Sequence, residues 1–522
     1  MTADAILRTE VHFKDRMLQC FADRPKSVMD KLDGIIAQFG ASVAVVDETR
    51  SVTYDELSAR VDACAHQLQA LGLVSGARVG LILSNRLEFV VSLLAVWRLG
   101  AVPVPMNVRE AAPETAFILN DCSAAGLIFD PAHDRAIPSG TDVPDLKFRL
   151  EVGQIAPSLP QDTAFTAPTL DLAEDDMACI LYTSGTTGKP KGAMLTHLGI
   201  IHSMLHYEHH LGVGPNDAAL LVVPATHVTG LIGLVMVSLG AGAKLVMVEE
   251  FKTRAVLQVA EREKVSYTIM VPAMYNLLLL REDLTQFDLS AWRVGAYGGA
   301  MMPVATIEKL ADLLPDLQLA NAYGATETTS PTTIMPLGAD QSYFDTIGKP
   351  VACAEVRIMT EDFVECNTGE VGEIWIRGPM VVSGYFNRPD ATASEFVAGF
   401  WRSGDMGSMG ADGFMRIFDR KKDVVNRGGY KVFSSEVENI LMTHDNVAEA
   451  AVIAKPCPVL GERVHAVVCL KTAGSDAEAL KALCYEKLSD YKVPESFSFS
   501  DTPLPRNANG KVLKRQLKEM FL

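Results

Sequence analysis

The sequence predicts an α/β protein. A large N-terminal domain, built from two doubly wound α/β subdomains and a small β-rich subdomain, precedes a small α+β C-terminal domain. A chain of 522 residues is too long for one core. Short apolar strands alternate with amphipathic helices, as in a largely parallel sheet. The charged run 419–422 lacks apolar residues and marks a boundary. We therefore predict an N-terminal domain at 1–418, a hinge at 419–422 and a C-terminal domain at 423–522.

The first α/β unit is predicted within residues 41–105, and the residues before Ala41 are expected to form entry helices. From Asp55, apolar residues recur at helical spacing and predict one buried helix face: Leu57, Val61, Ala65, Leu68 and Leu71. The other predicted elements are strands at 41–47, 52–54, 79–83 and 101–105, and a helix at 88–99. Residues 130–169 are rich in Pro, Asp and Ser and are expected to form surface loop and connection.

A second unit of the same kind follows. Its predicted elements are strands at 177–182, 219–224, 244–248, 267–271 and 293–297, and a helix at 198–211. Between residues 347 and 376 the pattern changes to short alternating strands, which indicates the β-rich subdomain. The C-terminal domain is predicted from helices at 436–442 and 477–488 and strands at 447–453 and 465–470.

Composition limits the classes of function. A net charge of −17, from 47 basic and 64 acidic residues, argues against nucleic acid as a general partner. No apolar run approaches the about 20 residues that span a membrane, and the N-terminus shows no secretory apolar segment. The nine cysteines are scattered without paired or metal-type spacing, which fits reduced thiols. We therefore expect a cytoplasmic protein without a transmembrane segment.

The stretch from Thr183 to Gly192 has the composition of a phosphate-binding loop. Its glycines let backbone N–H groups turn toward an anion, while hydroxyls and two lysines add donors and charge. It is not a Walker loop, because Pro190 follows Lys189 where Ser or Thr is required. A flexible linker is the alternative, but linkers rarely carry two lysines and a proline straight after an apolar strand. The residues expected to bind nucleotide here are Thr183, Ser184, Gly185, Thr186, Thr187, Gly188 and Lys189.

Two further motifs carry carboxylates. In Asn-Ala-Tyr-Gly-Ala-Thr-Glu (321–327), Glu327 offers the hard oxygen ligands that magnesium prefers, and Tyr323 offers a face for a purine base. The alternative is a helix entry with Thr326 as N-cap. In Ser403-Gly404-Asp405, the carboxylate of Asp405 can accept both hydroxyls of a ribose. The alternative there is a β-turn.

In this order the motifs resemble those of the acyl-adenylate-forming superfamily, which includes acyl-CoA synthetases, peptide-synthetase adenylation domains and firefly luciferases. The resemblance covers nearly the whole chain and is strongest to a fatty or aryl acyl-CoA synthetase. It implies an N-terminal AMP-binding domain that carries the ATP and acid sites, and a mobile C-terminal lid. It also implies ATP, Mg²⁺ and CoA as cosubstrates and cofactor.

Individual roles follow from the resemblance. The residues it places in catalysis are Lys511, Glu327, Thr326 and Lys422, with Glu327 as the metal ligand, Lys511 on the reacting carboxylate and Lys422 at the domain pivot. Further nucleotide contacts are implied for Gly298, Gly299, Ala300, Asn321, Ala322, Tyr323, Gly324, Asp405 and Arg420, the last two at the ribose. Gly429 is expected to pass close to the pantetheine arm of CoA. Asp419 stands where many synthetases have Gly, a difference interpreted as neutral for activity.

The resemblance also implies an acid pocket lined by residues 224–236, 294–302 and 328–337, with His227, Tyr297 and Met301 among its residues. None of these stretches contains Lys, Arg, Asp or Glu, so a second substrate carboxylate would have no cation to pair with. We therefore expect an ATP-dependent acyl-CoA ligase for an apolar monocarboxylic acid. A lone histidine is more often structural, but His227 matches a position where acyl-CoA synthetases commonly have His.

Several alternatives stay open at this point. A stand-alone adenylation enzyme that loads a carrier-protein phosphopantetheine would share every motif. A luciferase-like oxygenase has little support beyond Asp419, and the presence of Glu327 and Lys511 argues against a silent AMP-binding regulator. Pro505, four residues and then Gly510-Lys511 match a pattern by which protein lysine acetyltransferases recognise the catalytic lysine of several acyl-CoA synthetases. An acetyltransferase acting on Lys511 is therefore a candidate partner.

Overall fold

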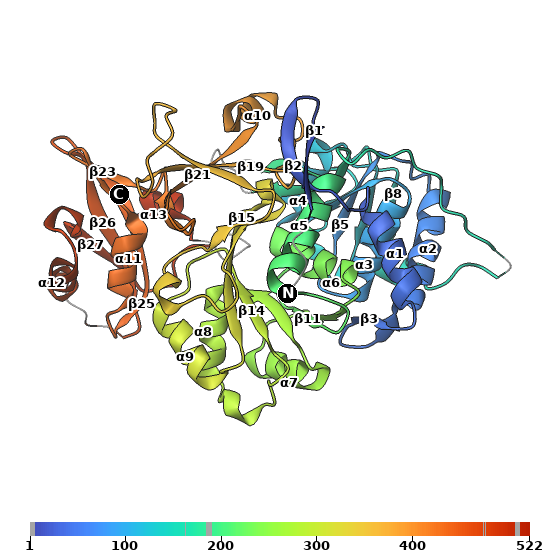
Figure 1. Cartoon of the computed structure of the whole chain (residues 1–522), viewed down its shortest axis with the longest axis horizontal. Coiled ribbons are helices and arrows are strands. Elements are labelled where there is room, and N and C mark those ends of the chain that lie inside the picture. Colours follow the sequence, from blue (N-terminus) through green and yellow to red (C-terminus); the bar gives the residue numbers. More distant parts are fainter. Residues whose placement is uncertain (1–5, 162, 184–189, 473, 475–476, 507–511) are drawn as a thin grey trace. The chain divides into compact units, whose positions relative to one another are not determined.

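The structure is a computed structural model that describes residues 6–161, 163–183, 190–472, 474, 477–506 and 512–522 (Figure 1). Its packing divides the chain into two compact units. The first unit is Met1–Val356 with Ile376–Trp401, and the second is Arg357–Trp375 with Arg402–Leu522. The expected α/β class is confirmed. The hinge expected at 419–422 lies within the second unit and stays a prediction.

A nine-stranded sheet forms the centre of the first unit, in the order β17-β16-β15-β14-β13-β11-β12-β3-β4. Its strands are β3 (Val43–Val46), β4 (Ser51–Thr53), β11 (Ala218–Leu221), β12 (Lys244–Met247), β13 (Tyr267–Met270), β14 (Val294–Tyr297), β15 (Gln318–Ala325), β16 (Ser330–Ile334) and β17 (Lys349–Pro350). The pairs from β15 to β3 are parallel, and the outer pairs β15/β16, β16/β17 and β3/β4 are antiparallel. Strands β12 and β13 flank β11, so the strand order reverses there. Ligands of such sheets bind outside the carboxyl ends of the strands at this reversal.

Helices cover both faces of this sheet. Helices α7 (Thr253–Glu263), α8 (Pro272–Arg281) and α9 (Val304–Leu313) share one apolar core with strands β11 to β14, and Figure 1 shows them together near β11 and β14. Helices α5 (His197–Leu211), η3 (Thr229–Met236) and α6 (Val237–Gly240) contact one another and strands of the same sheet. The element η3 is a π-helix, which none of the sequence patterns predicts.

A parallel four-stranded sheet makes the other α/β subdomain, in the order β6-β5-β7-β8. Its elements are β5 (Arg78–Ile82), β6 (Val102–Pro105), β7 (Gly126–Phe129), β8 (Phe148–Glu151), α2 (Tyr54–Ala70), α3 (Leu87–Arg98) and α4 (Ala112–Asp121). The expectation of only loop over 130–169 is wrong, because β8 and the 3₁₀ helices η1 (Pro131–Ala136) and η2 (Val152–Gln154) lie there. Strand β8 has four residues, of which Phe148 and Leu150 are buried, and its pairing with β7 decides its conformation.

The N-terminal segment also differs from the expectation of entry helices. Strands β1 (Leu7–His12) and β2 (Arg16–Phe21) form an antiparallel hairpin, and only α1 (Val28–Phe39) is helical. In β2 the buried Leu18 and Cys20 alternate with the exposed Met17 and Gln19, which is the period of a strand. A second correction concerns Leu71, which lies beyond the end of α2 and is exposed.

The predicted strand before the phosphate loop is β9 (Met177–Thr183), and the chain returns as β10 (Lys191–Thr196). The two strands pair antiparallel, with Thr183 opposite Lys191. The loop thus joins two strands of a hairpin, whereas a Walker loop leads into a helix. This supports the distinction drawn from Pro190.

The remaining elements of the chain confirm short strands near residues 347–376 and an α+β C-terminal part. Elements not yet named before residue 421 are η4 (Leu284–Gln286), η5 (Thr326–Thr328), η6 (Gln341–Tyr343), β18 (Glu355–Met359), β19 (Gly372–Arg377), α10 (Pro389–Glu395), β20 (Phe396–Val397), β21 (Phe400–Met409) and β22 (Met415–Arg420). The C-terminal elements are β23 (Val425–Arg427), β24 (Tyr430–Val432), α11 (Ser434–Met442), β25 (Val447–Cys457), β26 (Gly461–Leu470), α12 (Ala477–Lys487), η7 (Asp490–Lys492), β27 (Ser496–Ser500) and α13 (Lys514–Phe521). Their sheet has the order β24-β23-β26-β25, with β27 beside β26. Among the described residues, no helix has the length and apolar character needed to cross a membrane.

Candidate functional site

Three predicted site residues meet at the carboxyl ends of β14 and β15. Tyr297 ends β14 and lies directly across from Asn321 on β15. The amide Nδ2 of Asn321 donates to the Sδ atom of Met301 at 3.8 Å. Tyr297 is buried, and this burial raises the pKa of its phenol to about 12, with a hydrogen bond to Asn321 acting in the opposite direction. The structure therefore brings two predicted pocket residues and one predicted nucleotide contact side by side.

The glycines that follow β14 permit a close approach to β15. A Cβ atom at Gly298 would lie 2.6 Å from the carbonyl oxygen of Ala322, and Gly299 has a φ of +78°. Within β15, a Cβ atom at Gly324 would lie 1.5 Å from the carbonyl oxygen of Ser330. Only glycine fits these positions. The segment 298–300, including Ala300, and the segment 321–324, including Tyr323, thus lie on neighbouring strand ends.

His227 lies in the segment that follows β11, where the strand order reverses. Its ring is half-buried, and its Nδ1 atom accepts a hydrogen bond from the backbone N–H of Thr229 at 3.5 Å. Burial lowers the pKa of His227, so the neutral ring is favoured. The π-helix η3 begins two residues later, and π-helical turns often occur at functional sites.

Glu327 lies in η5, directly after β15, together with Thr326. The residue is 9% exposed, and its Oε1 atom lies 2.9 Å from the hydroxyl oxygen of Tyr385. Its own carbonyl oxygen accepts a hydrogen bond from the backbone N–H of Val382 at 2.9 Å. Burial raises the pKa of Glu327, and the nearby charge of Glu395 adds to this rise.

Tyr385, Glu395 and Lys191 extend this contact into a network that sequence reasoning missed. The hydroxyl oxygen of Tyr385 lies 2.6 Å from Oε2 of Glu395, and the Nζ atom of Lys191 lies 2.5 Å from Oε1 of the same carboxylate. The ammonium group of Lys191 also lies over the ring of Tyr385, 4.3 Å from its centroid. The second lysine of the phosphate loop was visible in the sequence, but no local pattern links it to residues about 200 positions later.

In the second unit, two predicted ribose contacts lie opposite each other. Asp405 on β21 pairs with Arg420 on β22 in the strand register, and Oδ1 of Asp405 lies 2.6 Å from Nε of Arg420. Lys422 is exposed in the turn that follows β22. Gly429 lies in the turn between β23 and β24 with a φ of +92°, and a Cβ atom there would meet no described atom within 4 Å.

Several predicted residues lie outside the described part of the chain, namely Ser184, Gly185, Thr186, Thr187, Gly188, Lys189 and Lys511. Thr183, the last residue of β9, is described and half-buried. Its hydroxyl donates to the carbonyl oxygen of Lys191 at 3.4 Å. This hydrogen bond joins the end of β9 to the start of β10.

Glu327 and a second place in the first unit offer atoms of the kind that bind metal ions. Glu327 fits Mg²⁺ chemically, because a nearly buried carboxylate presents hard oxygen ligands beside the phosphate loop's Lys191 network. The other group is Glu10, His12 and Cys20, whose candidate ligand atoms lie within 4.8 Å of one another. Arg24 donates to both oxygens of Glu10, at 2.9 and 2.8 Å, and holds the pKa of that carboxyl well below its usual range. Because the carboxylate is already paired with a guanidinium, this second group does not favour a cation.

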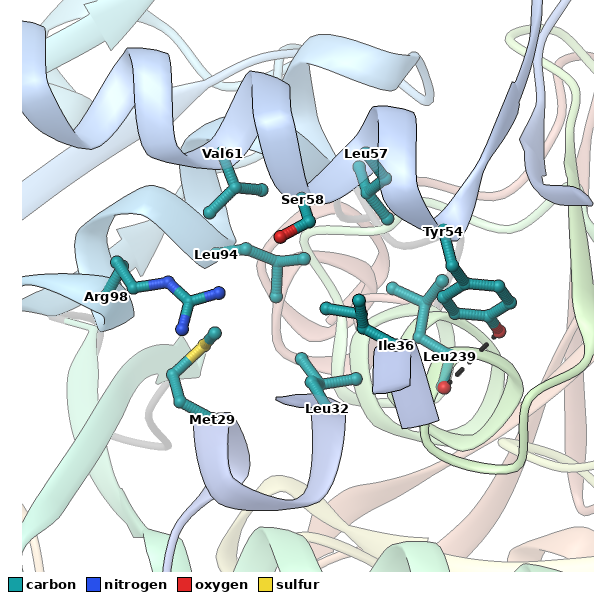
Figure 2. Close-up of a pocket in the computed structure, with 10 residues that line it drawn as sticks. All are labelled: Met29, Leu32, Ile36, Tyr54, Leu57, Ser58, Val61, Leu94, Arg98 and Leu239. Atoms are coloured by element: carbon teal, nitrogen blue, oxygen red, sulfur yellow. Dashed lines mark hydrogen bonds between the residues drawn. The ribbon is translucent and has the colours of Figure 1, made fainter. Parts of the chain in front are cut away.

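A cavity of about 10 Å³ lies between α1, α2 and α3 (Figure 2). Its lining consists of Met29, Leu32, Ile36, Tyr54, Leu57, Ser58, Val61, Leu94, Arg98 and Leu239. Such a volume holds about one water molecule. None of the predicted site residues lines it, so we interpret it as a packing gap.

Comparison with known proteins decides the family. Residues 33–386 match the family described as AMP-binding enzyme, and residues 436–511 match the AMP-binding enzyme C-terminal domain. The chain belongs to the AMP-binding enzyme family. It is 33% identical over 476 residues to a feruloyl-CoA synthase of an Amycolatopsis species, covering 90% of this chain and 94% of the relative. It is 31% identical over 478 residues to the long-chain-fatty-acid–CoA ligase FadD13 of Mycobacterium tuberculosis, covering 90% and 93%.

Solved structures show the same fold as this AMP-binding enzyme. The o-succinylbenzoate CoA synthetase MenE of Bacillus subtilis, in complex with its acyl-adenylate intermediate, superposes with a TM-score of 0.86 at 29% identity, covering 95% of this chain and 98% of that one. The same enzyme in complex with ATP and magnesium gives a TM-score of 0.84 at 29% identity, covering 94% and 99%. The expected superfamily and fold are confirmed, and the relatives place the chain in the class of AMP-forming acid–thiol ligases.

Proposed function

We infer that this AMP-binding enzyme is an ATP-dependent acyl-CoA ligase for an apolar monocarboxylic acid, either fatty or aryl. In the first half-reaction, a carboxylate oxygen of the acid attacks the α-phosphorus of ATP. The bond to the β-phosphate oxygen breaks, and pyrophosphate leaves. In the second half-reaction, the sulfur of CoA attacks the acyl carbonyl carbon, AMP leaves and the thiol proton passes to solvent. No enzyme nucleophile is required, because positioning and charge compensation carry the catalysis.

The substrate class rests on one observation. The three stretches assigned to the acid pocket, 224–236, 294–302 and 328–337, contain no Lys, Arg, Asp or Glu. Burying a second carboxylate against them would cost several kcal/mol without a compensating partner. The contact between Asn321 and Met301 and the burial of Tyr297 support a compact, apolar acid site at the ends of β14 and β15.

The remaining roles are proposed on the same basis. Glu327 would hold Mg²⁺, and Thr326 would contact phosphate; the metal, when bound, supplies positive charge to the phosphates. The adenosine contacts are proposed for Gly298, Gly299, Ala300, Asn321, Ala322, Tyr323, Gly324, Asp405 and Arg420. Lys422 would be the pivot, Gly429 would border the pantetheine path, and Lys511 would compensate the charge that develops at the α-phosphate.

A panel of acids tests the substrate class. Purified protein is incubated with ATP, Mg²⁺ and free CoA, and thioester formation is measured for medium-chain, aryl and dicarboxylic acids. Medium-chain or aryl acids are expected to turn over, while malonate and succinate react poorly. Turnover of malonate above every apolar acid would contradict the proposal. Thioester formation on free CoA without any carrier protein would distinguish CoA from a carrier-protein acceptor.

Tyr297 provides a more local test. Replacing Tyr297 by Ala is expected to change the preferred chain length or ring, because it removes a buried aromatic wall. The matched control is Tyr275→Phe on α8, which removes one buried hydroxyl whose hydrogen bond to the carbonyl oxygen of Ala296 is 2.9 Å long. The control should leave the order of substrates unchanged.

Control of the enzyme through Lys511 is a further part of the proposal. Acetylation removes the ammonium charge of a lysine. Adenylation should then fall toward the level of Lys511→Ala, while thioester formation from supplied acyl-adenylate should largely survive. Installing acetyl-lysine at position 511 and assaying each half-reaction tests this. Unchanged adenylation would remove both the regulation and the role given to Lys511.

We also place the enzyme in the cytoplasm. The nine cysteines are all free thiols and eight of them are buried, which fits a reducing compartment. Localisation of the tagged protein in fractionated cells tests this.

A further inference from the structure

Glu327 is held by one short segment of chain, 382–385, through both its backbone and its side chain. Val382 donates its N–H to the carbonyl oxygen of Glu327 at 2.9 Å, and Tyr385 reaches the carboxylate with its hydroxyl group at 2.9 Å. Two positions after Glu327, the hydroxyl of Thr329 donates to the carbonyl oxygen of Met380 at 2.7 Å, just before the same segment. The orientation of the proposed metal ligand therefore depends on where this segment lies.

Other elements of the first unit fix that segment. The N–H of Met194 on β10 donates to the carbonyl oxygen of Gly384 at 3.1 Å, and the N–H of Phe386 donates to the carbonyl oxygen of Gly192 at 2.8 Å. In addition, the guanidinium of Arg16 on β2 donates to the carbonyl oxygen of Val382 at 3.1 Å. The segment is thus tied to the strand that leaves the phosphate loop.

Side chains also connect β10 to the segment around Tyr385. Lys191, the first residue of β10, forms an ion pair with Glu395, the last residue of α10, with 2.5 Å between Nζ and Oε1. The Lys191 side chain is only 12% exposed, so solvent screens the pair weakly. The hydroxyl of Tyr385 lies between the two carboxylates, and since it has one proton it donates to one of them at a time. The contact with Glu395 is the shorter of the two, at 2.6 against 2.9 Å. Because Lys191 neutralises Glu395 through its other carboxylate oxygen, the charge of Glu395 competes less with Glu327 for the hydroxyl proton.

We propose that Tyr385 is a positioning residue, whose hydroxyl orients the Glu327 carboxylate for Mg²⁺ and, through Glu395, couples that carboxylate to Lys191 at the end of the phosphate loop. This inference rests on the proposed function, in which Glu327 holds the metal. The coupling has a physical consequence. Phosphate oxygens that attract Lys191 and a metal that attracts Glu327 act on two ends of the same network of hydrogen-bonded side chains. The binding of nucleotide and the binding of metal should therefore be cooperative.

The variant Tyr385→Phe tests the role with little change in packing. The residue is 3% exposed and its ring meets Phe396 edge-on, with 5.6 Å between the ring centroids, and phenylalanine preserves both contacts. Affinity for α,β-methylene-ATP is measured by calorimetry in excess Mg²⁺ and again in EDTA, for wild type and variant. The ratio of the affinity in Mg²⁺ to the affinity in EDTA should fall by about ten- to a hundredfold in Tyr385→Phe, the range expected for one hydrogen bond to a charged group.

Tyr54→Phe is the matched control. Tyr54 is equally buried, and its hydroxyl donates to the carbonyl oxygen of Ala243 at 2.7 Å, on elements that hold none of the proposed site residues. It loses one buried hydrogen bond as Tyr385→Phe does, but should keep the wild-type ratio. Because each ratio compares one variant with itself, a general loss of stability does not change it. A wild-type ratio in Tyr385→Phe would overturn the proposal.

A double-mutant cycle tests the coupling to the loop. If Tyr385 and Lys191 act through one network, the effects of Tyr385→Phe and Lys191→Ala on nucleotide affinity in Mg²⁺ will be less than multiplicative. Multiplicative effects would overturn the coupling. If wild-type protein binds the analogue equally with and without Mg²⁺, the proposed function and this inference are overturned together. If wild-type protein binds it more tightly with Mg²⁺ but the variants do not change the affinities as expected, this inference alone is overturned.

Discussion

Asp405 and Arg420 show what the structure adds at the scale of single residues. Both were expected to contact ribose, one from a Ser-Gly-Asp motif and the other from a charged run 15 positions later. The register of β21 and β22 places them opposite each other as an ion pair, with the Asp405 carboxylate buried. A carboxylate already held by a guanidinium keeps its orientation and needs no reorganisation to accept hydroxyl groups.

We predict that Asp405→Asn raises the KM for ATP in pyrophosphate exchange by about ten- to a hundredfold, since a charged acceptor of hydrogen bonds contributes about 1.5–3 kcal/mol. Glu373→Gln is the control. Glu373 is also a buried acid paired with basic side chains, Arg402 and Lys421, each at 3.2 Å. Its replacement should lower stability but leave the KM for ATP within about twofold. Equal KM changes in both variants would point to a general structural effect.

At the scale of elements, the helix predicted at 198–211 is confirmed as α5, and the structure adds that this helix carries buried histidines. His202 is fully buried, donates from Nδ1 to the carbonyl oxygen of Leu198 at 2.9 Å and accepts at Nε2 from the N–H of Phe21 at 3.2 Å. Only a neutral ring can make both bonds. Burial lowers the pKa of His202 to about 3, and the nearby Arg24 and His12 contribute in the same direction.

This arrangement predicts loss of stability in acid. The unfolded chain takes up a proton at His202 near pH 6.5, whereas the folded protein takes up that proton only near pH 3. The free energy of unfolding therefore falls as the pH drops through this window. At pH 5 the shifted pKa of His202 lowers the free energy of unfolding by about 2 kcal/mol. In urea titrations at pH 7 and pH 5, His202→Gln should show a smaller difference than wild type. His209→Gln, a half-buried histidine of the same helix, should keep the wild-type difference.

The cavity between α1, α2 and α3 gives a second prediction for elements. Leu94 on α3 is 3% exposed and lines it (Figure 2). Leu94→Ala enlarges an existing gap, so it should lower the free energy of unfolding by about 2–5 kcal/mol, which denaturant titration measures. Val74→Ala, at a residue that is 59% exposed, should change it by less than about 0.5 kcal/mol. Similar losses in both variants would argue against the packing explanation.

For the whole molecule, the proposed chemistry is divided between two compact units. The first holds Glu327, Thr326 and the proposed acid pocket, and the second holds Asp405, Arg420, Lys422 and Gly429. The two half-reactions are proposed to use different contacts of the C-terminal part. They should therefore be separable by mutation.

We predict that Lys511→Ala suppresses adenylate formation far more than thioester formation from supplied adenylate, by about 10²–10³-fold, the range for one group that stabilises transition-state charge. Gly429→Leu should do the reverse, because a bulky side chain would obstruct the pantetheine path. The backbone at Gly429 has a φ of +92° and disfavours any side chain, so Gly429→Ala is the control for strain. Both half-reactions are assayed separately. If each variant loses adenylate formation and thioester formation equally, the assignment of the two residues to different half-reactions is refuted.

The α/β alternation of the N-terminal part, the strand before the phosphate loop and the family of the protein followed from the sequence alone. Apolar periodicity is a local property, and glycines, hydroxyls and carboxylates at fixed spacing are visible without a fold. Tertiary structure decided the β1/β2 hairpin, the short edge strand β8 and the contact between Asn321 and Met301. It alone revealed the hydrogen bonds and the ion pair that connect Glu327 to Tyr385, Glu395 and Lys191. These features depend on strand pairing and on contacts between residues up to about 200 positions apart, and no local pattern encodes which distant side chain will complete a buried hydrogen bond.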